Sequence, residues 1–182
     1  MTSKIKTEIE VFTDHIKRIY EKVCLGAELR KIKVSTFIED KKGEFRESTS
    51  REFSKIEDLI KYLNELKPGR YMTDISIEFT CILPSDKPIN YEEICKFLSE
   101  LSREGEEKYG LYTYYDSSYP KTGFRKIIAK VNTFPEERVE ILWFLEKPMI
   151  NVRASYMSLG IGKHRDVKIS GTVNIYGKGE EI

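Results

Sequence analysis

The sequence has few of the residues that build metal sites and disulfide frameworks, and it lacks a long apolar run. It contains three cysteines and two histidines in 182 residues. Cys24, Cys81 and Cys95 are isolated, with no CxxC pair or Cys/His cluster, so we expect no disulfide framework and no zinc site. The longest purely apolar run, residues 141–145, is far too short to span a membrane. The amino-terminal segment lacks the apolar core of a signal peptide. We therefore expect a cytoplasmic protein without metal, cofactor or membrane attachment.

An excess of charge of one sign is also missing. Lysine and arginine total 31 against 30 aspartates and glutamates, which gives a net charge of +1. Any electrostatic attraction of a partner must therefore come from a local surface. Hydrophobic residues make up 40% and charged residues 34% of the chain, so a packed core is expected. Glutamine is absent, and lysine and glutamate are frequent, which is a thermophile-like composition.

Two segments near the carboxyl end alternate apolar and polar residues with a period of two. This alternation over residues 149–161 and 164–176 predicts two strands, each with one buried face. Gly162-Lys163 lies between them and favours a two-residue type II′ turn, which would pair Ile161 with His164. This register places Val152 opposite Val173 and Arg153 opposite Thr172.

The rest of the chain alternates between helical and strand-like periodicity. Ser54 with Glu57 forms a predicted capping box, and Asn90 with Glu93 forms a second predicted helix start. Predicted helices cover residues 4–24, 54–66, 91–108 and 135–145. Predicted strands cover residues 29–38, 71–83, 109–115 and 124–134, and residues 44–53 form an edge strand or a loop.

These elements predict an α+β fold with a mainly antiparallel sheet and helices packed on one face. From residue 71 to 161 the order is strand, helix, strand, strand, helix, strand. This is the order of a ferredoxin-like βαββαβ unit, here extended by a carboxyl-terminal hairpin strand. We expect one domain over residues 1–182, with an amino-terminal lobe (1–68) and a ferredoxin-like lobe (69–182) as a possible division.

Motifs for catalysis are lacking. The sequence has no phosphate-binding loop and no dinucleotide fingerprint. Its two histidines, His15 on a predicted helix and His164 in the predicted turn, carry no recognisable catalytic spacing. The sequence therefore favours a non-enzymatic protein. A small enzyme whose site is built from loops stays open as an alternative.

Two short segments share part of a motif with RNA-binding families. The glycine-rich, basic residues 159–165 are similar to the glycine-rich loop of the CRISPR-associated RAMP family, but the downstream Gly-x-Gly is missing. Residues 121–126 supply a lysine, a glycine and Phe124, as the third strand of an RRM does. Lys126 occupies the position of the second stacking aromatic in that motif. The sequence assigns the chain to neither family.

Basic and aromatic residues gather on the strand positions that point away from the predicted core. We predict that this open sheet face binds RNA or DNA, with lysine and arginine contacting phosphates and aromatic rings stacking on bases. A protein–protein assembly module that uses a sheet edge, including a homodimer, is a further alternative. The predicted nucleic-acid-binding residues are Lys31, Lys33, Lys126, Lys130, Arg153, Lys168, Phe124, Tyr112 and Tyr114.

Overall fold

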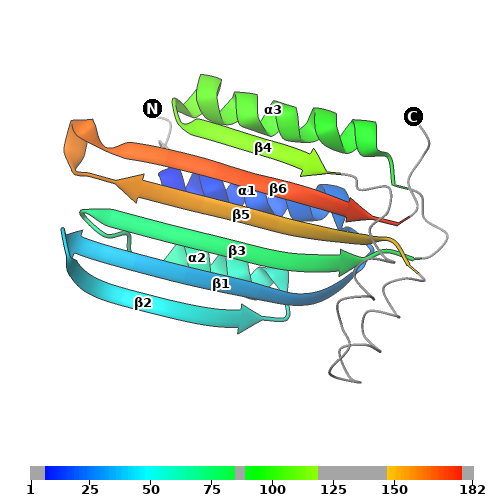
Figure 1. Cartoon of the computed structure of the whole chain (residues 1–182), viewed down its shortest axis with the longest axis horizontal. Coiled ribbons are helices and arrows are strands. Elements are labelled where there is room, and N and C mark those ends of the chain that lie inside the picture. Colours follow the sequence, from blue (N-terminus) through cyan, green and yellow to red (C-terminus); the bar gives the residue numbers. More distant parts are fainter. Residues whose placement is uncertain (1–6, 85–88, 119–146, 178–182) are drawn as a thin grey trace, which may run out of the picture.

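The computed structural model describes residues 7–84, 89–118 and 147–177. Within these ranges helices and strands follow each other in the order seen in Figure 1. The elements are α1 (Glu8–Val23), β1 (Glu28–Lys41), β2 (Glu44–Phe53), α2 (Ile56–Glu65), β3 (Met72–Ile82), α3 (Tyr91–Tyr109), β4 (Tyr112–Ser118), β5 (Met149–Leu159), the 3₁₀ turn η1 (Gly162–His164) and β6 (Asp166–Tyr176).

The strands form one six-stranded sheet in the order β2-β1-β3-β5-β6-β4. Neighbouring strands are antiparallel except β4, which runs parallel to β6. Helices α1 and α2 lie behind the sheet in Figure 1, and the opposite face is turned to the viewer. The predicted α+β class, with a mainly antiparallel sheet, is confirmed.

Alternation along the strands decides which face the helices cover. On β1, Ile32 and Val34 are almost fully buried whereas Lys33 between them is exposed. On α1, Phe12 and Ile16 lie four residues apart on one helix face and have no exposed surface. Burial of these apolar side chains is the main stabilising contribution to such a layered fold. One sheet face is consequently left open and polar.

The β5–β6 hairpin has the predicted register, but its turn differs from the prediction. Val152 lies opposite Val173 and Arg153 opposite Thr172, as predicted. The strands end at Leu159 and start again at Asp166, so the connection is wider than the predicted two-residue turn and contains η1. Both connections are centred on the same point and have an even length. The pairing of all strand residues is therefore unchanged.

The helix starts are partly as predicted. Asn90 caps α3, because its side-chain oxygen accepts a 3.0 Å hydrogen bond from the Glu93 amide. The capping box predicted at Ser54 is wrong: Lys55 is the N-cap of α2, and it makes no side-chain capping bond. None of the helices within the described ranges is long and apolar enough to cross a membrane.

The ferredoxin-like unit stays a prediction. Its predicted third strand (124–134) and second helix (135–145) lie outside the described residues. Strand β1 pairs with β3, so segments before and after residue 68 contribute to one sheet. The parallel pairing of β4 with β6 was not predicted, because element order does not reveal which strands become neighbours.

A disulfide joins Cys24, directly after α1, to Cys81 on β3. The expectation that the cysteines stay unpaired is therefore wrong for these two. Their Cα atoms are 5.7 Å apart, within the usual range for a disulfide, although 57 residues separate them in sequence. Cys95 is the free cysteine. Isolated cysteines carry no pairing signal in a sequence, because only the fold brings them together.

Candidate functional site

A row of serines crosses the open face from strand to strand. The strand registers place Ser50 opposite Ser35, Ser35 opposite Ser76, Ser76 opposite Ser155, and Ser155 opposite Ser170. We call these five residues the serine row. The Ser155 and Ser170 hydroxyls are 2.9 Å apart and hydrogen-bonded. Small side chains at successive positions lower the surface here, and their hydroxyls can both donate and accept hydrogen bonds.

A charged row runs beside the serine row, two residues along each strand. Its order across the sheet is Glu52, Lys33, Glu78, Arg153, Thr172 and Asp116. Arg153 Nε lies 3.5 Å from Glu78 Oε2 in an exposed ion pair. Such a pair contributes little to stability, so the guanidinium can exchange this partner for another anion at small cost.

The opposite side of the serine row is lined by Asp74, Met157, Lys168 and Tyr112, which are successive partners across β3, β5, β6 and β4. Lys168 Nζ lies 5.7 Å from the centre of the Tyr112 ring, at cation–π distance. Burial raises the pKa of the Asp74 carboxyl above its usual value. The contact between Lys168 and Tyr112 joins β6 to the edge strand β4.

The central members of these rows line a shallow groove of about 780 Å³ across the open face. Its floor contains four members of the serine row, and its walls include Lys33, Arg153, Lys168 and Thr172. Tyr112 and Tyr114 close the groove at strand β4. The groove is polar, open to solvent and larger than a single small ion needs, which suits an extended polar ligand.

Both tyrosines are exposed, with 55% of Tyr112 and 54% of Tyr114 accessible to solvent. They are two residues apart on β4 and therefore point to the same side of the strand, about 6.8 Å apart. The intervening Thr113 is buried, as is Tyr115. Exposed aromatic rings at this spacing are available for stacking.

The structure brings six of the predicted site residues to this region. Lys33, Arg153, Lys168, Tyr112 and Tyr114 line the groove. Lys31 forms a 2.7 Å ion pair with Glu52. The remaining three predicted residues, Lys126, Lys130 and Phe124, lie outside the described residues.

Two features of the open face were not predicted from the sequence. Glu52 and Asp116 were not identified, so carboxylates are more frequent on this face than expected. The predicted hairpin register pairs Ser155 with Ser170, which is confirmed, but the sequence did not reveal that Ser50, Ser35 and Ser76 continue this row across three further strands. Alternation shows which face each serine occupies, but only the strand order and registers align them.

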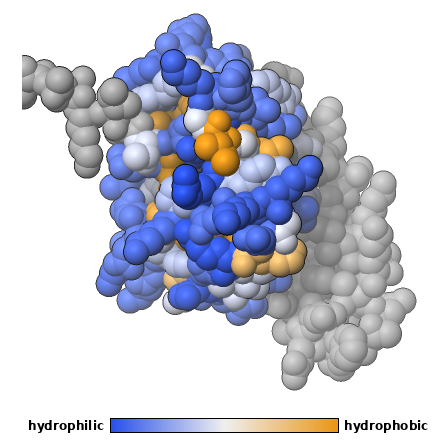
Figure 2. Space-filling model, turned by 90° about the vertical axis from the view of Figure 1, so that its left-hand side faces the viewer, coloured by the Kyte–Doolittle hydropathy of each residue, from blue (hydrophilic) through white to orange (hydrophobic). Residues whose placement is uncertain are grey.

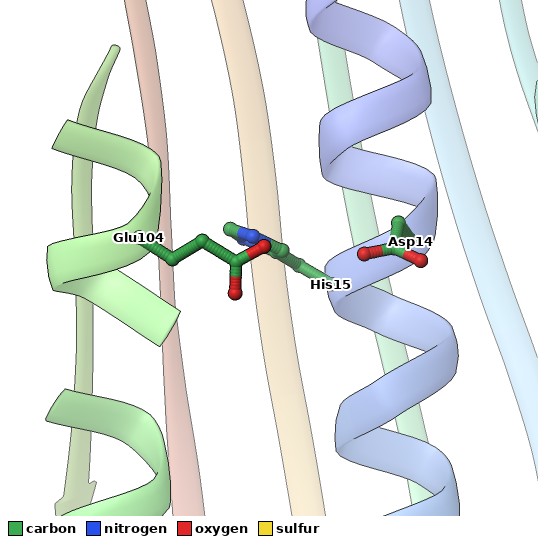
Figure 3. Close-up of side chains that lie close together, drawn as sticks. All are labelled: Asp14, His15 and Glu104. Atoms are coloured by element: carbon green, nitrogen blue, oxygen red, sulfur yellow. The ribbon is translucent and has the colours of Figure 1, made fainter. Parts of the chain in front are cut away.

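A second cluster lies between α1 and α3 (Figure 3). One ligand atom from each of Asp14, His15 and Glu104 lies within 4.8 Å of the others. Arg18 Nη1 is 2.7 Å from a Glu104 oxygen and 3.4 Å from an Asp14 oxygen. A guanidinium therefore already supplies the positive charge for both carboxylates. The cluster is accounted for as an ion-pair contact that joins the two helices.

His15 itself is fully buried and contacts strand β4. Its Nδ1 lies 3.3 Å from the Tyr115 hydroxyl, and the two rings meet edge to face with centroids 5.7 Å apart. Burial raises the pKa of the Tyr115 phenol well above its usual value, so the phenol is neutral in the folded protein. This contact packs α1 against β4 and does not reach the groove.

No family model matches the chain, and neither a curated protein nor a solved structure matches it. Function must therefore be argued from the groove and its side chains.

Proposed function

We propose that the chain is a non-enzymatic binding module that holds single-stranded RNA or DNA on its open sheet face. The ligand lies over β5, β6 and β4, where the groove ends at Tyr112 and Tyr114. The pair of exposed tyrosines beside Lys168 is the observation that carries this proposal.

The spacing of the tyrosines suits consecutive bases. Two rings about 6.8 Å apart on one strand can each stack on one base of an extended single strand. A duplex offers no such faces, because its bases are stacked on each other. Stacking on a tyrosine depends little on base identity, so weak sequence preference follows.

The cations and hydroxyls of the groove supply contacts to the sugar–phosphate backbone. Arg153 and Lys168 lie on neighbouring strands, β5 and β6, on either side of the serine row. Ser155, Ser170 and Thr172 add hydroxyl donors around them. In the other half of the face, Lys31 and Lys33 lie beside Glu52 and Glu78, so carboxylates offset the attraction of these two cations for phosphate.

Titration of a labelled single-stranded oligonucleotide tests the proposal. The double variant Arg153→Glu/Lys168→Glu is compared with Lys17→Glu/Lys61→Glu, which has the same change in net charge on exposed positions of α1 and α2. We expect the groove variant to lose affinity while the helix variant retains it. Loss of the two phosphate contacts in the groove variant should also lower the slope of log K against log salt by about 1.4.

The tyrosines give a second, uncharged readout. Tyr112→Ala and Tyr114→Ala should each weaken binding by about 1–3 kcal/mol through loss of a stacked base. Equal affinities for the groove and helix variants, or the absence of binding at low salt, would contradict the proposal.

A further inference from the structure

Strand β2 forms one edge of the sheet, and Figure 1 shows no described element beyond it. Its outer backbone groups are therefore a template on which another strand can add. The strand spans Glu44–Phe53, one of the longer edges that a small sheet presents. Five of its ten residues are glutamate or arginine.

The sequence of β2 is self-complementary about Thr49. Moving outwards from Thr49, the mirrored positions hold Ser48 and Ser50, then Glu47 and Arg51. The next mirrored positions hold Arg46 with Glu52 and Phe45 with Phe53. Within residues 45–53, each acidic residue thus has a basic residue as its mirror, and each remaining residue has one of its own kind.

An antiparallel pair of identical strands converts this symmetry into contacts. A two-fold axis through Thr49 places Glu47 of one copy directly opposite Arg51 of the other, and the reverse pair forms by symmetry. Directly opposed residues have Cα atoms about 4.5–5.5 Å apart, which suits opposite charges. Within one strand, Glu47 and Arg51 are about 13.6 Å apart and cannot meet.

The local geometry of β2 agrees with this pairing. From Glu47 to Phe53 the register against β1 is regular. Glu47 and Arg51 lie on the helix-covered side, next to Tyr62, and the Arg51 guanidinium lies 5.2 Å from the centre of that ring. A register shift lies just before Glu47, and Arg46 bonds there to the Lys67 carbonyl. The complementary contacts are therefore concentrated in residues 47–51.

We propose that a second copy of this chain pairs with the first through β2, antiparallel and centred on Thr49. The two sheets then form one continuous sheet of twelve strands, because each contributes six. A two-fold axis perpendicular to the sheet puts all helices on one side and both open faces on the other. Charged residues on an edge strand commonly prevent association. Here their mirrored signs make the same charges favour a second copy.

Sedimentation equilibrium over a concentration series tests the pairing by charge reversal. Wild type is expected to dimerise. Arg51→Glu and Glu47→Arg each create two like-charge pairs and should raise the dimer dissociation constant about tenfold or more. Glu44→Arg is the matched control, since it makes the same charge change on β2 outside the symmetric segment and should leave the dissociation constant unchanged.

Restoration of pairing identifies the partner residues. The double variant Glu47→Arg/Arg51→Glu should dimerise like wild type. A mixture of the two single variants should form a heterodimer, because one chain then carries two acidic residues and the other two basic residues at the paired positions. Thr49→Cys, in a Cys95→Ser background, should form an intermolecular disulfide across the axis, whereas Ser50→Cys should not.

A wild-type monomer at every concentration would overturn the proposal and leave the charges of β2 as protection against association. A dimer that tolerates Arg51→Glu, or that the double reversal fails to restore, would place the interface elsewhere. Both outcomes leave the oligonucleotide titration unaffected, since none of the altered residues lines the groove.

Discussion

Loss of the Cys24–Cys81 disulfide is expected to lower the free energy of unfolding by about 4 kcal/mol. The bond closes a loop with a sequence separation of 57 residues. Chain-entropy theory gives an entropy of about −14 cal/mol/K for closing a loop of this length in the unfolded chain, or about 4.2 kcal/mol at 25 °C. Both cysteines are fully buried within the core.

Urea unfolding followed by circular dichroism measures this effect. The oxidised protein is compared with protein that was unfolded and refolded under reducing conditions, because the buried bond is shielded from reductant in the folded state. With a slope of about 2 kcal/mol/M, the midpoint should fall by about 2 M. The melting temperature should fall by about 8–16 °C.

Cys95→Ser is the matched control. Cys95 lies outside the disulfide, and its sulfur is 2.9 Å from the Ser117 hydroxyl. Its replacement should change the free energy of unfolding by no more than about 1 kcal/mol. Coincident unfolding curves for oxidised and reduced protein would refute the reasoning. Titration of three free thiols in the unfolded, unreduced protein would refute the disulfide itself.

Two further predictions concern single side chains. Gly105→Ala in α3 should lower the free energy of unfolding, measured by urea titration, by about 1–3 kcal/mol, because the new Cβ would lie 2.1 Å from Thr113 Oγ1. Alanine normally stabilises a helix relative to glycine, so the steric clash must outweigh this gain. A more stable variant would contradict the close approach. Asp74→Asn should stabilise the protein at pH 7. Burial raises the pKa of the Asp74 carboxyl in the folded protein above its pKa in the unfolded chain. The ionised carboxylate therefore lowers the free energy of unfolding as the pH rises through the unfolded pKa and then the folded pKa. Thermal melts at pH 7 and pH 3 should show this gain shrinking at the lower pH, and a gain that is equal at both values would contradict it.

Within the described residues, the sequence alone was sufficient for the three helices and for most of the strands, whereas residues 44–53 stayed open between an edge strand and a loop. Its alternation gave the correct pairing of Val152 with Val173 even though the connecting turn was wrong. The physical reason is that a slip by one residue would move every apolar side chain of a strand to the open face. Asn90 was likewise identified as the cap of α3, since capping depends on residues only three positions apart.

Only the tertiary structure decided which distant residues meet. The disulfide partners lie far apart in sequence, as do Ser76 and Ser155, which join the two halves of the serine row, and local patterns carry no information about which distant strands become neighbours. The parallel pairing of β4 with β6 places Tyr114 beside Ser170 and so completes the groove. The mirrored charges of β2 are present in the sequence, but they become available to a second copy only because the fold leaves β2 at the edge of the sheet.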